Sequence, residues 1–202
     1  MLQKYNTSPD RDRTGCAVAS SIGRDAAPAI NAVLSARRID TFLSEMMRSI
    51  RLSLPDEAAT RRLGARLGAI LRQGDIVALA GDLGAGKTTL ARGVIQAALG
   101  SDEPVPSPTF TLVQIYERPE SGEPAIWHFD LYRLTGPEEL VELGWVEALE
   151  AGISLVEWPD RAGDALPDEA LRVELREDGA GRIAIVSGSE QWMERCEAGL
   201  RE

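Results

Sequence analysis

The sequence predicts an α/β domain in which helices pack against a mixed parallel and antiparallel central sheet. From residue 50 onward, apolar strand-like runs alternate with segments of helical period. At residues 75–99, one such run leads through a glycine-rich stretch directly into a helix. The runs at 110–116 and 125–132 flank a turn marked by proline and glycine, which predicts an antiparallel hairpin.

The glycine-rich stretch matches the phosphate-binding pattern G-x-x-x-x-G-K-[ST] in full. Its members are Gly81, Asp82, Leu83, Gly84, Ala85, Gly86, Lys87, Thr88 and Thr89. Backbone N–H groups hold phosphate in such a loop, so glycine stands where a side chain would intrude. Lys87 places a point charge at the outer phosphates, and the Thr88 hydroxyl is a ligand for Mg²⁺. The stretch therefore predicts a compact P-loop NTPase-like domain that binds a nucleotide.

The context of the loop favours this interpretation over an ordinary glycine-rich turn with a stray lysine. An apolar strand at 75–80 precedes it, and a helix that ends at Gly100 follows it, in the order that the motif requires. Lys4 and Lys87 are the only lysines, and arginine supplies every other basic side chain. A compact ammonium therefore stands where a phosphate is expected.

Composition limits the class of protein. A chain of 202 residues with 44% hydrophobic and 27% charged residues is typical of one soluble globular domain. No apolar run is long enough to span a membrane, and the first residues lack the apolar core of a secretory signal, so we expect a cytoplasmic protein without membrane contact. Cys16 and Cys196 form no metal or redox motif.

The charge differs between two parts of the chain. Residues 1–45 hold six basic and five acidic groups without periodicity, and we expect a disordered N-terminal extension, with Met46 or Met47 as an alternative translation start. Residues 46–202, predicted as a single P-loop ATPase domain, hold 16 basic and 27 acidic groups, a net charge of −11. Direct contact with nucleic acid is not expected from such a surface.

The remaining elements follow from periodicity and from start and stop signals. They are a strand at 50–54, a helix from Asp56 and Glu57 to Gly74, a helix at 138–150, strands at 153–156, 171–175 and 183–186, and a C-terminal helix containing Trp192.

Several side chains after the loop are candidates for chemistry. Asp130 and Glu157 end apolar runs, where a P-loop protein places the acid that holds Mg²⁺ and its water; the alternative for each is an exposed strand-end carboxylate. Thr109 is a candidate switch threonine or a locally bonded loop hydroxyl. Trp158 either stacks on the nucleotide or packs in the core. We assign His128 no catalytic role, because strand histidines are mostly structural.

Four motifs in series identify a family. They are GDLGAGKTT at 81–89, SPTFTLV at 107–113, HFDLYRL at 128–134 and EWP at 157–159. The series resembles the TsaE (YjeE) family, the ATPase subunits of bacterial tRNA threonylcarbamoyladenosine (t6A) biosynthesis. The resemblance extends from about residue 48 to residue 187, and it implies a compact α/β fold with ATP and Mg²⁺ as cofactors.

The resemblance also implies roles for individual residues. The predicted catalytic residues are Lys87, Asp130 and Glu157, and the predicted metal ligands are Thr88, Asp130 and Glu157. Ser107 and Thr109 would belong to a switch-like loop, Trp158 would border the nucleotide, and Glu57 and Arg182 would flank its base. The implied partners are TsaD and TsaB, of which TsaD transfers threonylcarbamoyl to adenosine 37 of tRNAs that read ANN codons.

The function expected from these residues is Mg²⁺-dependent ATP hydrolysis coupled to conformational cycling of the partner enzyme. Turnover should be slow in isolation, because no internal arginine finger is identifiable. A small-molecule kinase is one alternative, although no arginine-bearing lid or acceptor pocket is evident, and Arg118 and Arg133 are isolated. The second is a nucleotide-dependent regulatory protein without physiological turnover. A GTPase is disfavoured, since no N-K-x-D sequence is present.

Overall fold

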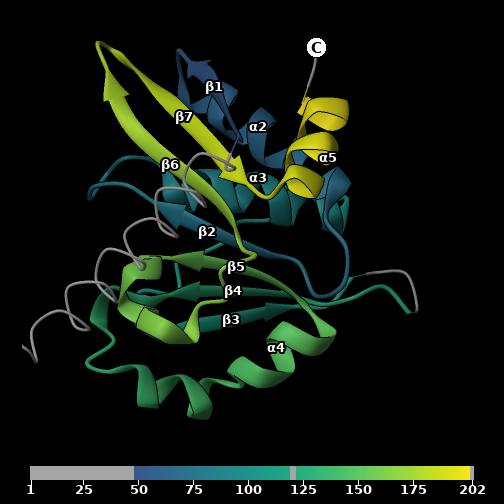
Figure 1. Ribbon diagram of the computed structural model, residues 1–202, viewed down its shortest axis with the longest axis vertical. Coiled ribbons are helices and arrows are strands. Elements are labelled where there is room, and N and C mark those ends of the chain that lie inside the picture. The colour runs from purple at the N-terminus through teal and green to yellow at the C-terminus, as the bar shows by residue number, and fades with distance from the viewer. Residues whose placement is uncertain (1–47, 119–121, 201–202) are drawn as a thin grey trace, which may run out of the picture. The chain divides into compact units, whose positions relative to one another are not determined.

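The computed structural model describes residues 48–118 and 122–200, so the expected extension at 1–45 lies outside the described part. The described residues form a seven-stranded sheet in the order β1-β7-β6-β2-β5-β4-β3 (Figure 1). Its strands are β1 (Arg48–Leu54), β2 (Ile76–Ala80), β3 (Val113–Tyr116), β4 (Ile126–Asp130), β5 (Ile153–Glu157), β6 (Leu171–Asp178) and β7 (Gly181–Gly188).

The sheet is mixed, as predicted. The four neighbouring strands β6, β2, β5 and β4 are parallel to one another. Antiparallel strands complete both edges, with β7 and β1 beyond β6, and β3 beyond β4. The parallel strands therefore end together at one edge of the sheet, which is where ligand sites form in α/β folds.

Helices cover both faces of the sheet, as Figure 1 shows. The helices α2 (Glu57–Ile70), α3 (Lys87–Leu99) and α5 (Glu190–Leu200) contribute Leu67, Leu90 and Trp192 to one apolar core. On the other face, α4 (Trp145–Ala151) and three 3₁₀ turns (Leu131–Arg133, Pro137–Leu143 and Pro159–Ala165) enclose a second core around Phe129 and Trp145.

Helices α2 and α3 touch through their backbones. A Cβ on Gly64 of α2 would lie 2.3 Å from the Leu90 carbonyl oxygen, and one on Gly93 of α3 would lie 2.3 Å from the Arg61 carbonyl oxygen. Only glycine permits so close an approach. The Asp56 carboxylate caps α2 by accepting the Ala59 N–H at 2.6 Å, which fixes where this helix begins.

Two predicted helices differ from those observed. The helix predicted at 138–150 is a 3₁₀ turn followed by the short α4, because Gly144 between them has a φ of 75° and a Cβ there would lie 2.9 Å from the Trp127 ring. The first helix ends at Ile70 and not at Gly74, because Leu71 is already extended, with a ψ of 146°.

The predicted hairpin strands are also shorter than expected. The run at 110–116 becomes a strand only from Val113, since Leu112 has a φ of 63° and its N–H closes a turn onto the Pro108 carbonyl at 2.7 Å. The returning strand ends at Asp130, where a 3₁₀ turn begins. Within residues 48–118 and 122–200, no helix has the length and apolar character needed to cross a bilayer.

Candidate nucleotide-binding and catalytic site

The glycine-rich loop joins β2 to α3 at the edge where the parallel strands end. Gly81 and Gly86 have φ values of 134° and 107°, which L side chains rarely adopt. A Cβ on Gly81 would also lie 2.4 Å from the Leu175 carbonyl oxygen of β6. The loop conformation therefore depends on glycine, as the motif predicts.

The Lys87 side chain turns back into the loop and is only 4% exposed. Its Nζ donates to the carbonyl oxygens of Gly81 and Asp82 at 2.7 and 2.8 Å, and lies 3.8 Å from the centre of the Trp158 ring. Burial lowers the pKa of Lys87, while Glu157, Asp130 and Asp82 oppose this shift. The ammonium is thus desolvated and lies close to carboxylates on neighbouring strands.

The Glu157 carboxylate, at the end of β5, is held on both of its oxygens. Thr88 donates from its hydroxyl to Oε2 at 2.9 Å, and the His128 Nε2 lies 2.8 Å from Oε1. Glu157 is 2% exposed and His128 is fully buried. The first hydroxyl of α3 and the acid of β5 are therefore in direct contact.

Asp130 ends β4 directly beside Glu157 in the parallel register. Its Oδ2 accepts hydrogen bonds from Thr109 at 2.6 Å and Ser107 at 3.4 Å, and these two hydroxyls lie 2.8 Å apart. Its Oδ1 accepts the Tyr132 N–H at 3.2 Å. The loop at 107–109 is therefore fastened to the second acid of the site.

These groups surround one cavity of about 220 Å³. It is lined by Leu83, Gly84, Gly86, Lys87, Thr88, Thr89, Ser107, Thr109, Asp130, Glu157 and Trp158. Asp130 and Glu157 are thus not exposed strand ends, and Thr109 does not bond only within its own loop.

Trp158 has a left-handed backbone, with a φ of 59°. Its N–H donates to the Leu79 carbonyl of β2 at 3.3 Å, and its ring lies 4.9 Å from that of Tyr132. A left-handed conformation is unfavourable for tryptophan and indicates a position determined by its surroundings. Trp158 therefore borders the cavity beside Lys87 and also packs against its neighbours.

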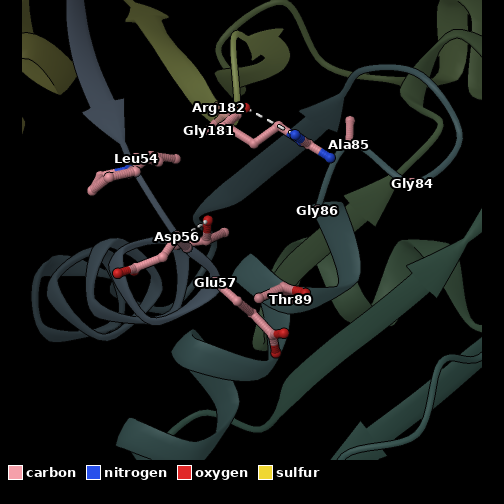
Figure 2. A pocket seen from close by; sticks show the side chains of 12 residues that line it. Leu54, Asp56, Glu57, Gly84, Ala85, Gly86, Thr89, Gly181 and Arg182 are labelled. Atoms are coloured by element: carbon pink, nitrogen blue, oxygen red, sulfur yellow. Dashed lines mark hydrogen bonds between the residues drawn. The ribbon is translucent and has the colours of Figure 1, made fainter.

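A second cavity of about 250 Å³ lies on the other side of the loop and shares Gly84, Gly86 and Thr89 with the first. Glu57, from the start of α2, and Arg182, from β7, are among its lining residues; they come together because β1 pairs with β7. In Figure 2, Arg182 extends toward Ala85 of the loop, and Glu57 extends past Thr89. The Arg182 Nη1 donates to the Gly181 carbonyl at 2.8 Å.

Comparison with known proteins agrees with this geometry. The family model described as "Threonylcarbamoyl adenosine biosynthesis protein TsaE" matches residues 54–184. The chain belongs to the TsaE family. This confirms the resemblance found in the sequence motifs, and the matched segment includes the loop, both acids and Trp158.

TsaE proteins of several bacteria are similar along most of their length. The protein from Haemophilus influenzae is 39% identical over 148 residues, which cover 70% of this chain and 91% of that protein. The Treponema pallidum protein is 34% identical over 142 residues, covering 69% and 99%. Both are named tRNA threonylcarbamoyladenosine biosynthesis protein TsaE.

A solved structure supports the fold. The crystal structure of YdiB from Bacillus subtilis superposes with a TM-score of 0.62 at 27% sequence identity, and covers 77% of this chain and 97% of that one. The TsaE chain described here thus has a P-loop NTPase-like fold, as predicted, with the mixed sheet and flanking helices described above.

The oxygen ligands of the first cavity fit Mg²⁺ carried by a nucleotide. Thr88, Asp130 and Glu157 offer a hydroxyl and two carboxylates, the hard donors that Mg²⁺ prefers. Within the described ranges, no group of three or more His, Cys, Asp and Glu side chains could hold a metal ion alone. Mg²⁺ usually binds through one or two carboxylates together with phosphate oxygens and water, and Asp130 and Glu157 offer two carboxylates here.

The contact of His128 with the site was not predicted from the sequence. Side chains alternate along a strand, so His128 and Asp130 lie on the same face of β4. This shared face is the feature of the sequence that could have indicated that His128 lies near the site. The contact itself depends on β4 lying beside β5.

Proposed function

We propose that this TsaE chain is a cytoplasmic, Mg²⁺-dependent subunit that binds and hydrolyses ATP. We further propose that it serves the threonylcarbamoylation of adenosine 37 in tRNAs reading ANN codons, acting on a TsaD–TsaB complex. The observation that carries the proposal is the convergence of Lys87 and Thr88 with Asp130 and Glu157 around one cavity. The family and the names of its relatives support the assignment to t6A biosynthesis.

Lys87 is the principal phosphate-binding side chain in this proposal. Its ammonium now donates to two neutral carbonyls, and a phosphate oxygen would give it an anionic acceptor and a stronger hydrogen bond. Because the site is buried, the attraction is greater than it would be in water. The start of α3 adds backbone N–H groups and the helix dipole.

Thr88, Asp130 and Glu157 would hold Mg²⁺ and the attacking water. When bound, Mg²⁺ neutralises charge that develops on the phosphate oxygens. The two carboxylates end adjacent parallel strands and divide two tasks, holding the metal's water and orienting the attacking water. Each is fixed by hydroxyl donors before the nucleotide arrives, so little reorganisation is needed during the reaction.

The side chains of the same cavity support a dependence on a partner. None of the described residues that line it is an arginine, so this part of the chain supplies no arginine finger to the phosphates. We propose that a TsaD–TsaB complex completes or stabilises the active arrangement. The net charge of −11 on residues 46–202 favours docking to protein over direct contact with tRNA.

The test is ATP hydrolysis by the purified chain, alone and with TsaB and TsaD from the same organism. Lys87→Ala serves as the blank. Glu157→Gln should retain ATP binding and lose turnover and t6A formation, whereas Glu147→Gln, at an exposed position on α4, should behave as wild type. Strong stimulation by the pair is the expected result.

Other outcomes favour the alternative functions. Fast turnover that does not respond to the pair contradicts the proposal and favours an independent hydrolase, and phosphate transfer to a small acceptor favours a kinase. If Glu157→Gln supports t6A formation as well as wild type does, hydrolysis is not required, and the chain acts as a nucleotide-dependent regulator.

A further inference from the structure

We propose that His128 is a positioning residue, which fixes the Glu157 carboxylate by donating a hydrogen bond from its imidazole Nε2. This role rests on the proposed function, because Glu157 serves ATP hydrolysis there. The His128 side chain is 0% exposed, so it cannot contact a nucleotide directly. Within the described residues, its side chain has one hydrogen-bond partner, Glu157, at 2.8 Å.

Without the contact from His128, the Glu157 carboxylate would have one side-chain hydrogen-bond partner instead of two. Thr88 holds Oε2 of Glu157 at 2.9 Å, and His128 holds Oε1. Two donors on opposite oxygens fix both the position of a carboxylate and its rotation. Without His128, the carboxylate can turn about its bond to Thr88, and a catalytic group misplaced by about 1 Å loses much of its effect.

The surroundings of the imidazole identify its tautomer. An ionised carboxylate accepts hydrogen bonds and cannot donate them, so Nε2 of His128 carries the hydrogen that lies between them. The other nitrogen, Nδ1, is buried and has no hydrogen-bond partner within residues 48–118 and 122–200. A hydrogen on Nδ1 would be a buried donor without an acceptor.

The contact acts on the orientation of the acid. A hydrogen bond donated to Oε1 holds the carboxylate in one position at the end of β5. This resembles the way in which outer hydrogen-bond partners orient metal-binding groups in other proteins.

A purely structural histidine is the competing explanation. An apolar side chain would fill a buried strand position without leaving an unsatisfied nitrogen. His128 leaves Nδ1 unsatisfied and directs Nε2 to the acid at the end of the next strand. Packing alone does not explain this choice of residue.

The tautomer can be measured without any variant, because His128 is the single histidine among 202 residues. In protein purified without a histidine tag, one set of imidazole ¹⁵N signals must belong to His128. We expect the hydrogen on Nε2. A hydrogen on Nδ1 with none on Nε2 would overturn the proposal.

Two variants separate positioning from packing. The amide nitrogen of His128→Gln can take the place of Nε2, whereas that of His128→Asn reaches only the place of Nδ1. With TsaB and TsaD present, we expect His128→Asn to lower kcat by about 10–100-fold at unchanged ATP affinity, as loss of such an outer partner does elsewhere. His128→Gln should restore most of the rate.

Combining the variants with Glu157→Gln completes the test. If His128 acts through Glu157, then His128→Asn should not lower the residual single-turnover rate that Glu157→Gln retains. Additive losses, or losses that follow the Tm of the variants, would show a structural role. If the wild type itself lacks turnover, the proposed function fails, whereas the imidazole signals still decide whether His128 is the donor to Glu157.

Discussion

The contact between α2 and α3 leads to a prediction about Gly64→Ala. The added methyl group would lie 2.3 Å from the Leu90 carbonyl oxygen and 3.0 Å from both the Gly93 Cα and the Val94 nitrogen. Ordinary contacts are near 3.5 Å, so the helices must separate by about 1 Å. All three neighbouring atoms belong to the backbone of α3, which cannot move aside by a change of rotamer.

Two opposing terms determine the size of the effect. Alanine is favoured over glycine within a helix by about 1 kcal/mol. Forcing a methyl group into a closely packed contact costs about 1–3 kcal/mol, with the upper end appropriate to rigid backbone. We therefore expect Gly64→Ala to lower the free energy of unfolding by about 2 kcal/mol, which corresponds to a Tm lower by about 4–8 °C for a domain of this size.

Gly68→Ala provides the matched control, because it lies one turn further along α2 and gains the same helix propensity. Its added methyl group would lie 3.2 Å from the Val94 carbonyl oxygen, so a small adjustment accommodates it. Urea and thermal unfolding of the two variants therefore isolate the contact at Gly64. The reasoning is refuted if Gly64→Ala is as stable as Gly68→Ala or as the wild type.

Three further predictions concern other side chains. Lys87→Met removes the ammonium but keeps a long side chain, and calorimetry should show an ATP affinity reduced by about 10–100-fold. ATP binding as tight as that of the wild type would contradict this prediction. Thr109→Val removes the closest side-chain donor to Asp130, at 2.6 Å, and should lower the free energy of unfolding measured in urea by about 1–2 kcal/mol. Ser107→Ala should cost less, because the Ser107 hydroxyl lies 3.4 Å from Asp130. Equal losses in the two variants would contradict this prediction. Burial raises the pKa of Cys196 from 9.0 to about 11. The native thiol then stays protonated where the unfolded one ionises, so stability should fall as pH rises from 9 toward 11, and Cys196→Ala should remove this slope.

The sequence predicts the phosphate loop well because its chemistry is local. A strand, a glycine-rich turn and a helix lie within 25 consecutive residues, and the types of residue needed to approach phosphate are few. The parallel order of neighbouring strands then brings Asp130 and Glu157 to one edge. The two acids that line the cavity could therefore be predicted from the sequence alone.

The rest depends on contacts between distant segments. His128 meets Glu157 only because β4 lies beside β5, and Glu57 and Arg182 line the same cavity only because β1 pairs with β7. The break at Gly144 reflects the Trp127 ring packed against it, which no helical period reveals. These features are properties of the assembled sheet and not of any single stretch of sequence.

The burial of Lys87 has a consequence for how this protein can be chemically modified. It is the only lysine between residues 48 and 200, and its ammonium is enclosed by two carbonyls and an indole ring. Acetylating enzymes and amine-directed cross-linkers therefore have no exposed lysine target on the described domain. A partner protein bound to the described domain would therefore form no cross-link through a lysine of that domain. Reagents that activate carboxylates suit the mapping of such a contact, because the domain carries many Asp and Glu side chains.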